Sequence, residues 1–259
     1  MTVSIGTNSA ALLAAHHLSV NRQSLEASMT RLASGKRINS AQDDAGSLGV
    51  AASLLANIKG ADMAKQNANA AIAAVQVADG ALVEVEVMMQ RIRELAVQKS
   101  STGTYSTTDI TNMESEITQL LAEVVDIKAN TKFNGTEVSS LALNPAIRQD
   151  GSTEAMALPA FLAGTEIDKD SAATDVDTLI NSVAAARGSL GAFLNRLTST
   201  VNNLSSISAN TSAAYSRVMD TDYAKETAEV ARGQVLQQAG AAVLAQANAS
   251  QQYVLTLLQ

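Results

Sequence analysis

The 259-residue sequence contains no cysteine, no tryptophan and only two prolines. Without cysteine the chain has no disulfides, no thiolate chemistry and no cysteine-based metal sites. Both prolines, Pro145 and Pro159, lie in one short central stretch. The remaining sequence on either side is free of the residue that interrupts long helices. These absences favour long helices over a disulfide-rich fold.

Aromatic residues are also scarce, at 3% of the sequence, although apolar residues reach 46%. Much of that apolar content is alanine, whose small side chain lets helices approach closely. Alanine buries little area, however, and apolar burial yields only about 25 cal/mol per Å². We therefore expect long, thin helix packing rather than a compact globular monomer.

The charge and hydropathy patterns exclude further classes. A net charge of −7 argues against a nucleic-acid partner, which would need clustered Lys and Arg. No run of 18 or more uncharged, mainly apolar residues is present, so we expect no membrane insertion. The first residues lack the basic start of a secretory signal. If the protein leaves the cell, we expect a route that keeps its N-terminus intact.

Apolar residues recur at alternating steps of three and four over most of the chain, which predicts helices. A cap is predicted from Ser106 and Asp109, and a shift of register at Leu190–Leu194. The predicted helices cover Leu18–Leu32 (ending near Gly35), 45–60, Ala71–Ala96, Ile110–Ile127 and Val176–Val218. The last of these would be roughly 65 Å long.

The C-terminal segment is predicted to start as a helix near Asp222. It carries a coiled-coil seam that continues almost to the last residue of the sequence. The seam consists of Leu236, Gly240, Val243, Ala247, Ser250, Val254 and Leu257. An isolated helix of this kind is marginal in water. We expect both terminal segments to be loosely ordered until a partner packs on them.

Residues 133–172 lose the helical period. Asn134-Gly135 is a strong hairpin-turn signal, and the following residues alternate only weakly. The sequence thus predicts a mainly α fold: a long antiparallel helical bundle or coiled coil with paired terminal helices and a small β-hairpin tip.

Several motifs, taken in order, make the sequence resemble bacterial flagellin. They include "RLASGKRINSAQDDAGSLGVA" (31–51), "NIKG" (57–60), "NANAAIAAVQVADGAL" (67–82), "QRIRELAVQ" (90–98), "ESEITQLLAEV" (114–124), "KFNG" (132–135), "TVNNLSS" (200–206), "DTDYAKETAEVARGQVLQQAGAAVLAQAN" (220–248) and "VLTLL" (254–258). The resemblance covers residues 1–135 and 175–259. One such motif is weak, but this many in order are highly specific.

The resemblance implies a filament subunit whose terminal segments pair and line a hollow tube. Residues 1–42 and 222–259 would form that inner domain, 43–132 and 173–221 the helical core, and 133–172 a short tip in place of outer domains. Subunit contacts would then involve the terminal helices, through Leu18, Leu25, Leu32, Leu236, Val243, Val254 and Leu257. Implied partners are further copies of the chain, the flagellar export apparatus, a flagellin chaperone, and the cap and hook-junction proteins. The implied location is the extracellular filament.

Two departures from the family pattern are visible. The central insert is very short, so large outer domains should be missing. The stretch "VEVEVMMQ" (83–90) is more apolar than is usual there. We therefore expect more of this helix to be buried.

Gln90, Arg91, Leu95 and Glu116 match a patch that contacts the vertebrate toll-like receptor for flagellin in flagellins which that receptor detects. The alternative reading is that the patch exists for packing between subunits along the filament. Both readings hold together if the receptor detects a surface that assembly needs.

We find no catalytic, cofactor or metal site in the sequence. His16 and His17 are adjacent and lack the i+4 spacing of a helical metal pair, and the H-E-x-x-H motif is absent. The paired carboxylates Asp43-Asp44 and Asp220/Asp222 are better explained as caps and turns. The stretch "SSTGTYSTT" offers hydroxyls for O-glycosylation, although a solvated turn explains it as well.

The leading function is therefore structural and not enzymatic: a self-assembling subunit of the bacterial flagellar filament that serves motility. The alternatives are a hook–filament junction protein and a flagellin-like surface binding protein. The latter would need aromatic stacking residues, and the chain has only three Phe and four Tyr.

Overall fold

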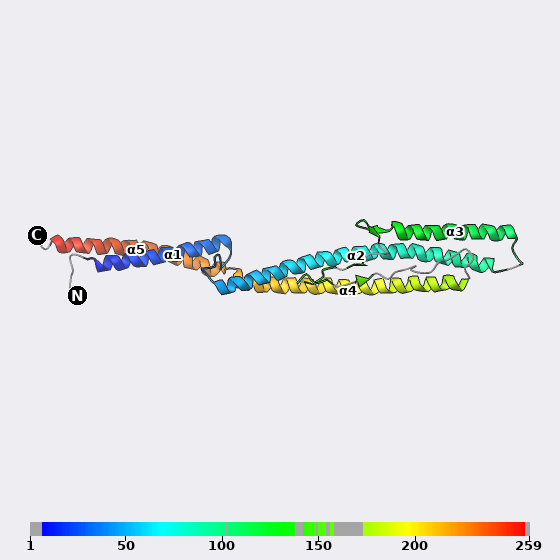
Figure 1. Ribbon diagram of the computed structural model, residues 1–259. Helices are drawn as coiled ribbons and strands as arrows, with labels where there is room; N and C mark the ends of the chain where they lie inside the picture. Colours follow the sequence, from blue (N-terminus) through cyan, green and yellow to red (C-terminus); the bar gives the residue numbers. More distant parts are fainter. Residues whose placement is uncertain are drawn as a thin grey trace. The chain divides into compact units, whose positions relative to one another are not determined.

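The computed structural model describes residues 7–101, 103–137, 142–143, 145–148, 150–153, 156–157 and 173–256. These residues are mainly helical (Figure 1), as predicted. The helices are α1 (Ser9–Ser34), α2 (Ala45–Lys99), α3 (Thr107–Asn130), α4 (Ala173–Met219) and α5 (Tyr223–Thr256). The strands are β1 (Lys132–Phe133), β2 (Thr136–Glu137), β3 (Ala142–Leu143) and β4 (Met156–Ala157).

The chain divides into two compact units. The terminal unit comprises Met1–Leu55 and Thr211–Gln259, and the central unit comprises Ala56–Asn210. These units reflect packing within one chain. The predicted division by place in a filament, with an inner domain of 1–42 and 222–259, stays a prediction. No helix in the described part of the chain is long and apolar enough to cross a membrane.

Helix α2 corrects one sequence prediction. The segments 45–60 and 71–96, predicted as separate helices, belong to one continuous helix, Ala45–Lys99. The buried side chains of Ala61, Ala64 and Ala68 carry the spacing of the later segment back through the gap. In this stretch both the buried face and the rest of the helix are rich in alanine. The sequence therefore shows no clear helical period of apolar residues there.

The core of the central unit lies where α2, α3 and α4 pack together (Figure 1). Its largest fully buried side chains include Leu82, Met89, Ile92, Leu179 and Leu190. Arg187 of α4 lies against two carboxylates of α2, with its Nε 3.0 Å from Asp79 Oδ1 and a further pair to Glu86. Apolar burial thus holds this unit together, and ion pairs flank it.

Helix α3 begins at the predicted cap. The Ser106 hydroxyl accepts a hydrogen bond from the Asp109 N–H, and the Asp109 carboxylate accepts one from the Ser106 N–H. This reciprocal capping box satisfies two N–H groups that a helix start leaves unpaired. The register shift predicted in α4 is visible as well, because Phe193 and Leu194 are both only half-buried between Leu190 and Leu197.

The predicted hairpin forms at Asn134-Gly135, where β1 pairs antiparallel with β2. Both turn residues have positive φ, 51° for Asn134 and 80° for Gly135, as a type I′ turn requires. A second antiparallel pair joins β3 to β4. Residues 158–172 lie outside the described part of the chain.

Part of the expected tip folds back onto the helices. Ile147 is buried in a cluster with Ala68, Ala71 and Leu197, and the Asn67 side chain donates to the Ala146 carbonyl at 3.0 Å. The alanines leave room on α2 that a branched side chain fills. This part of the insert therefore covers the helices instead of projecting from them.

Candidate assembly surface

Helices α1 and α5 lie side by side and run antiparallel in the terminal unit (Figure 1). Leucines of α1 sit directly over glycines of α5. A Cβ added to Gly240 would lie 2.9 Å from Leu18 Cδ1, and one added to Gly233 would lie 3.1 Å from Leu25 Cδ1. The glycines thus allow an approach that a larger residue would prevent.

Polar side chains fasten the two helices at intervals. The Asn21 amide donates to the Gly233 carbonyl at 2.8 Å, and the Asn8 amide donates to the Ala247 carbonyl at 3.1 Å. At the other end of the pair, the Tyr223 hydroxyl donates to the Leu32 carbonyl at 2.9 Å. These bonds tie side chains of one helix to the backbone of the other and fix its position along the pair.

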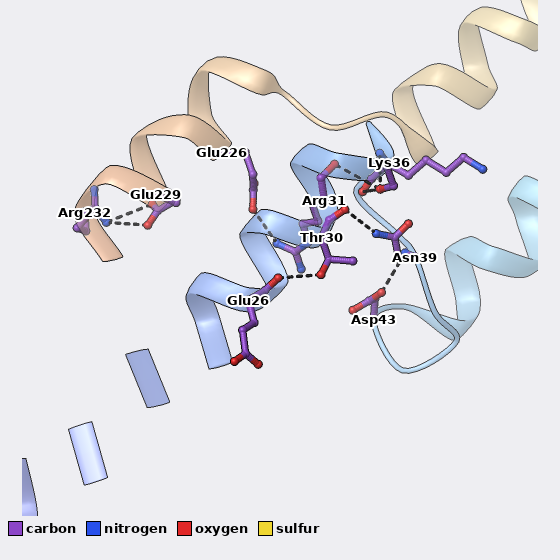
Figure 2. A network of polar contacts seen from close by, with 10 residues as sticks. Glu26, Thr30, Arg31, Lys36, Asn39, Asp43, Glu226, Glu229 and Arg232 are labelled. Carbon is purple, nitrogen blue, oxygen red and sulfur yellow. Dashed lines mark hydrogen bonds and ion pairs between the residues drawn. The ribbon is translucent and has the colours of Figure 1, made fainter. Parts of the chain in front are cut away.

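A buried carboxylate lies near the start of α5 (Figure 2). Glu226 Oε1 is 3.7 Å from Arg31 Nη1 of α1, and the Glu226 side chain is only 9% exposed. No hydrogen bond reaches this oxygen within the residues described. The pair adds an ionic contact to the hydrogen bonds that join the two helices.

The segment that follows α1 and the segment that precedes α5 pair through backbone hydrogen bonds. The Arg37 N–H donates to the Met219 carbonyl at 2.6 Å, and the Thr221 N–H donates to the Gly35 carbonyl at 3.0 Å. Gly35 has φ +70°, which ends α1 in the left-handed conformation that glycine tolerates best. At the predicted cap of α5, Asp222 Oδ1 accepts the Ala224 N–H at 2.9 Å.

The connector between α1 and α2 contains the predicted aspartate pair. Asp43 Oδ2 accepts the backbone N–H groups of Ser40 and Asn39 and the Ser40 hydroxyl, which lowers the pKa of Asp43. Hydrogen bonds from Ser47 lower the pKa of Asp44, and the bond from the Ser47 hydroxyl contributes more than the bond from its N–H. Both carboxylates therefore organise the turn, as the sequence predicted.

The face of α5 that meets α1 differs from the predicted seam. Gly240 and Ala247 belong to both, but the contact with α1 runs on through Gly233 to Glu226. The small residues decide this because only they allow close approach. The predicted Leu236 and Val243 are instead 51% and 58% exposed.

The other predicted terminal residues are placed as follows. Leu18, Leu25 and Leu32 are half-buried on the side of α1 that faces α5. Val254 belongs to α5, but its side chain and all of Leu257 lie outside the described residues. Gly233, Asn21 and Glu226 were missed by sequence reasoning, although counting small residues at heptad spacing would have found Gly233.

Leu236 and Val243 line one side of an open groove along the helix pair. Val20 and His17 of α1 line the other side. Further apolar side chains of the pair are exposed as well, namely Leu12, Leu13, Met29 and Val235. Exposed apolar side chains that gather along one groove, as Val20, Leu236 and Val243 do, are typical of interaction surfaces.

The second predicted patch comes together only in part. Arg91 of α2 bonds Glu116 of α3, with its Nη2 2.8 Å from Glu116 Oε1, and also pairs with Glu94 at 3.1 Å. Glu116 and Glu94 raise the pKa of Arg91 through these bonds. Gln90 is exposed beside them, but Leu95 is only 2% exposed and packs in the core. The exposed patch therefore consists of Gln90, Arg91, Glu94 and Glu116.

The stretch "VEVEVMMQ" is buried in part. Val85 is fully buried, Val83 is half-buried and Val87 is 57% exposed. On a helix Val83 and Val87 share one face at i and i+4, and Val85 lies on the opposite face, so the core that buries Val85 does not enclose the other two.

The described residues include no cluster of three or more His, Asp or Glu side chains able to hold a metal ion. The rings of His16 and His17 are 6.0 Å apart and both residues are exposed on α1.

Comparison with known proteins finds similarity over almost the whole chain. Residues 5–140 match the family model of the bacterial flagellin N-terminal helical region, and residues 173–258 match that of the C-terminal helical region. The chain is 34% identical to a flagellin of Bacillus subtilis (strain 168), over 98% of the chain and 99% of the relative. It is 36% identical to a flagellar filament 31.3 kDa core protein of Treponema maltophilum and 39% identical to a flagellin of Xenorhabdus nematophila, with the same coverage.

Long helices, terminal segments that pair on small residues and an exposed apolar face define a structural coiled-coil protein. The two family matches cover both helical arms and leave residues 141–172 of the insert unmatched between them. The chain belongs to the bacterial flagellin family, and it is a structural subunit of the flagellar filament, an extracellular appendage. These matches give no support to the junction-protein or surface-binding alternatives.

Proposed function

We propose that the chain assembles with many copies of itself into a hollow helical tube. The contact would use the exposed face of the α1–α5 pair that carries Leu236 and Val243. The observation that carries this proposal is the exposure of Leu236 and Val243, which a single chain leaves without cover. Burying such side chains contributes about 25 cal/mol per Å². Assembly of copies would supply the burial that the terminal unit lacks by itself.

The test is polymerisation of the purified protein, induced by seeds or salting out and followed by light scattering and electron microscopy. The double variant Leu236→Ser/Val243→Ser should lose polymerisation while its helices stay folded by circular dichroism. Ala242→Ser, a change at an exposed position elsewhere on α5, is the control and should polymerise normally. Removal of 226–259 should also abolish polymerisation. Normal filaments from the double variant or the truncated chain would refute the proposal.

In this arrangement the paired termini line the tube, the core helices surround them and the short insert faces outward. The family resemblance assigns the chain further partners: the export apparatus, a chaperone, and the filament cap and hook-junction proteins. Export would leave the N-terminus uncleaved. Mass spectrometry of filaments sheared from cells would test this, because removal of a leader would shorten the N-terminal peptide.

We further propose that the exposed patch of Gln90, Arg91, Glu94 and Glu116 serves contacts between subunits, and that the depolymerised monomer activates the vertebrate toll-like receptor for flagellin. The patch supports this because Arg91 holds two carboxylates in place at an exposed site. A reporter-cell assay should show weaker signalling from Arg91→Ala than from the wild type. Equal signalling would remove Arg91 from the proposal.

A further inference from the structure

A hollow of about 360 Å³ lies between the insert and α4, within the central unit. The residues that line it are Ile147, Arg148 and Asp150 of the insert, and Thr200, Asn203, Leu204 and Ile207 of α4. Small-molecule sites in proteins begin at a volume of about 300 Å³. The hollow is therefore large enough for a small ligand, and it shares no residue with the surfaces proposed above for assembly.

The apolar part of the lining is held in place by the fold. Ile147 is buried between α2 and α4, with only 5% of its surface exposed. Leu204 is 4% exposed, and Ile207 is half-buried beside it. The Asn67 amide fastens the insert at this point, because it donates to the Ala146 carbonyl at 3.0 Å. An apolar group of a ligand would thus meet a preformed surface.

The insert also brings one positive and one negative side chain to the hollow, Arg148 and Asp150, and both are exposed. The turn that carries them is closed by the Gly151 N–H, which donates to the Arg148 carbonyl at 3.0 Å. Asp150 Oδ1 accepts the Ser152 N–H at 2.9 Å and the Ser152 hydroxyl at 2.7 Å. These two bonds, and that from the N–H most, lower the pKa of Asp150, so the carboxylate is charged at neutral pH.

The Arg148 guanidinium makes no hydrogen bond or ion pair within the residues that the structure describes. Its five N–H donors are therefore open to a ligand. A planar guanidinium binds a carboxylate through two parallel hydrogen bonds, which is among the stronger polar contacts in proteins.

Helix α4 adds uncharged polar groups to the same hollow. Asn203 is exposed and offers a side-chain amide, which both donates and accepts. The Thr200 hydroxyl donates to the Arg196 carbonyl at 2.9 Å and can still accept a bond. Because residues three and four apart share a helix face, these polar groups lie on the same face as Leu204 and Ile207.

We propose that this hollow binds a free amino acid with an aliphatic side chain. The carboxylate of the ligand would bond to Arg148, its ammonium group to the Asp150 carboxylate, and its side chain would rest on Leu204 and Ile207. Asp150 disfavours a simple anion and Arg148 disfavours a simple cation, so the two charges together favour a zwitterion. The proposal goes beyond the structural role of the chain and does not depend on how copies assemble.

The test is a titration of the full chain with L-leucine, followed by the NMR chemical shifts of the Ile147 and Leu204 amides. Three related compounds each lack one recognised group: leucinamide lacks the carboxylate, N-acetylleucine lacks the ammonium group and glycine lacks the aliphatic side chain. Each should bind about tenfold more weakly than leucine, because it loses one charge-assisted hydrogen bond or the apolar contact.

Substitutions in the chain test the same contacts from the other side. Arg148→Gln and Asp150→Asn each remove one charge, and each should weaken leucine binding about tenfold. Asn at position 150 still accepts hydrogen bonds from Ser152, so the turn is kept. Asn202→Ala is the matched control: this residue is exposed on α4 next to Asn203 but does not line the hollow, and the variant should bind as the wild type does.

Weaker binding in both charge variants, with normal binding in Asn202→Ala, supports the inference. If a variant fails to fold by circular dichroism, the three related compounds still decide the matter on the wild-type chain. Equal binding of leucine, leucinamide and N-acetylleucine would overturn the proposal, as would leucine that causes no shift at the hollow. Polymerisation is measured separately, so either failure leaves the proposed function standing.

Discussion

The terminal and central units differ in what their helix contacts bury. In the central unit large side chains such as Leu82, Met89 and Leu190 are almost fully enclosed. In the α1–α5 pair the closest contacts are made by glycines, the leucines of α1 are half-buried, and Leu236 and Val243 remain exposed. The central unit thus has a core of buried large side chains, whereas the terminal pair leaves large apolar side chains of its own exposed.

This difference has an energetic consequence. Burying a leucine or methionine contributes about 1.5–3 kcal/mol, whereas a glycine contact contributes close approach and little area. We therefore expect the central unit to be stable in the monomer. The terminal pair should open at a much smaller free energy, until a neighbouring copy covers its apolar face.

The largest expected effect comes from emptying the central core. Leu82→Ala should lower the free energy of unfolding of the central unit by about 2–5 kcal/mol, because it removes buried carbon atoms and leaves a cavity. Leu236→Ala should change monomer stability by less than about 0.5 kcal/mol, since that side chain is exposed. Urea denaturation followed by circular dichroism measures both. Similar losses for the two variants would contradict the comparison between the units.

The second prediction concerns the glycine contact of the terminal pair. Gly240→Ala places a Cβ 2.9 Å from Leu18 Cδ1, and the overpacking cost of about 1–3 kcal/mol is offset in part by the gain of about 0.5–1 kcal/mol from alanine in a helix, so the opening free energy of the α1–α5 pair should fall by up to about 2.5 kcal/mol. Hydrogen exchange of the α5 amides measures this directly. Gly80→Ala is the control, because no neighbour lies within 4 Å of its added Cβ. That change should stabilise α2 by about 0.5–1 kcal/mol, and slower exchange in both variants would show that Gly240 has no packing role.

The third prediction is smaller and belongs to the central unit. Ser106→Ala removes the hydroxyl that caps α3 and should cost about 1 kcal/mol, because the Asp109 N–H loses its acceptor. Ser106→Asn keeps an acceptor at the cap and should remain near wild type. Hydrogen exchange of the first turn of α3 is the readout. If Ser106→Asn is as damaging as Ser106→Ala, the capping account fails.

Local signals in the sequence predicted much of the fold. The Ser106–Asp109 cap, the Asn134-Gly135 turn and the end of α1 at Gly35 each depend on a few adjacent residues, and each is confirmed. The exposed pair Arg91 and Glu116 also lies together, although 25 residues separate them. That last placement came from resemblance to a family and not from spacing.

Two of the differences between the prediction and the structure share a physical cause. Where alanine, glycine and serine form the contact face, the apolar contrast that reveals a helix face is lost. For this reason the sequence predicts two helices within α2, and it misses Gly233 in the contact between α5 and α1, although it places Gly240 in the seam of α5. Leu95 was assigned to a surface patch, but its burial depends on the packing of α3 and α4, which one helix does not reveal.

The smallest expected effect is a pH dependence of the connector in the terminal unit. Hydrogen bonds from Ser40 and Asn39 lower the pKa of Asp43, and those from Ser47 lower the pKa of Asp44. A carboxyl group whose pKa is lowered by folding stabilises the fold above its unfolded pKa of about 3.9, and this stabilisation is lost as the pH falls through the folded value. Hydrogen exchange at Asn39 and Ser40 should therefore become less protected below about pH 4, relative to the intrinsic rate.

Asp43→Asn separates this effect from general acid unfolding. The amide oxygen still accepts hydrogen bonds from the turn but does not titrate, so protection at Ser40 should no longer fall with pH. Asp109 serves as the comparison in the central unit, because Ser106 lowers its pKa in the same way while the core beneath α3 stays buried. Acid should thus loosen the start of α3 without opening its apolar contacts, whereas the connector has only the small cluster of Ile38, Ala51 and Met219 behind it. If the connector and the start of α3 lose protection together and to the same extent, the terminal unit is no more dependent on its polar contacts than the central one.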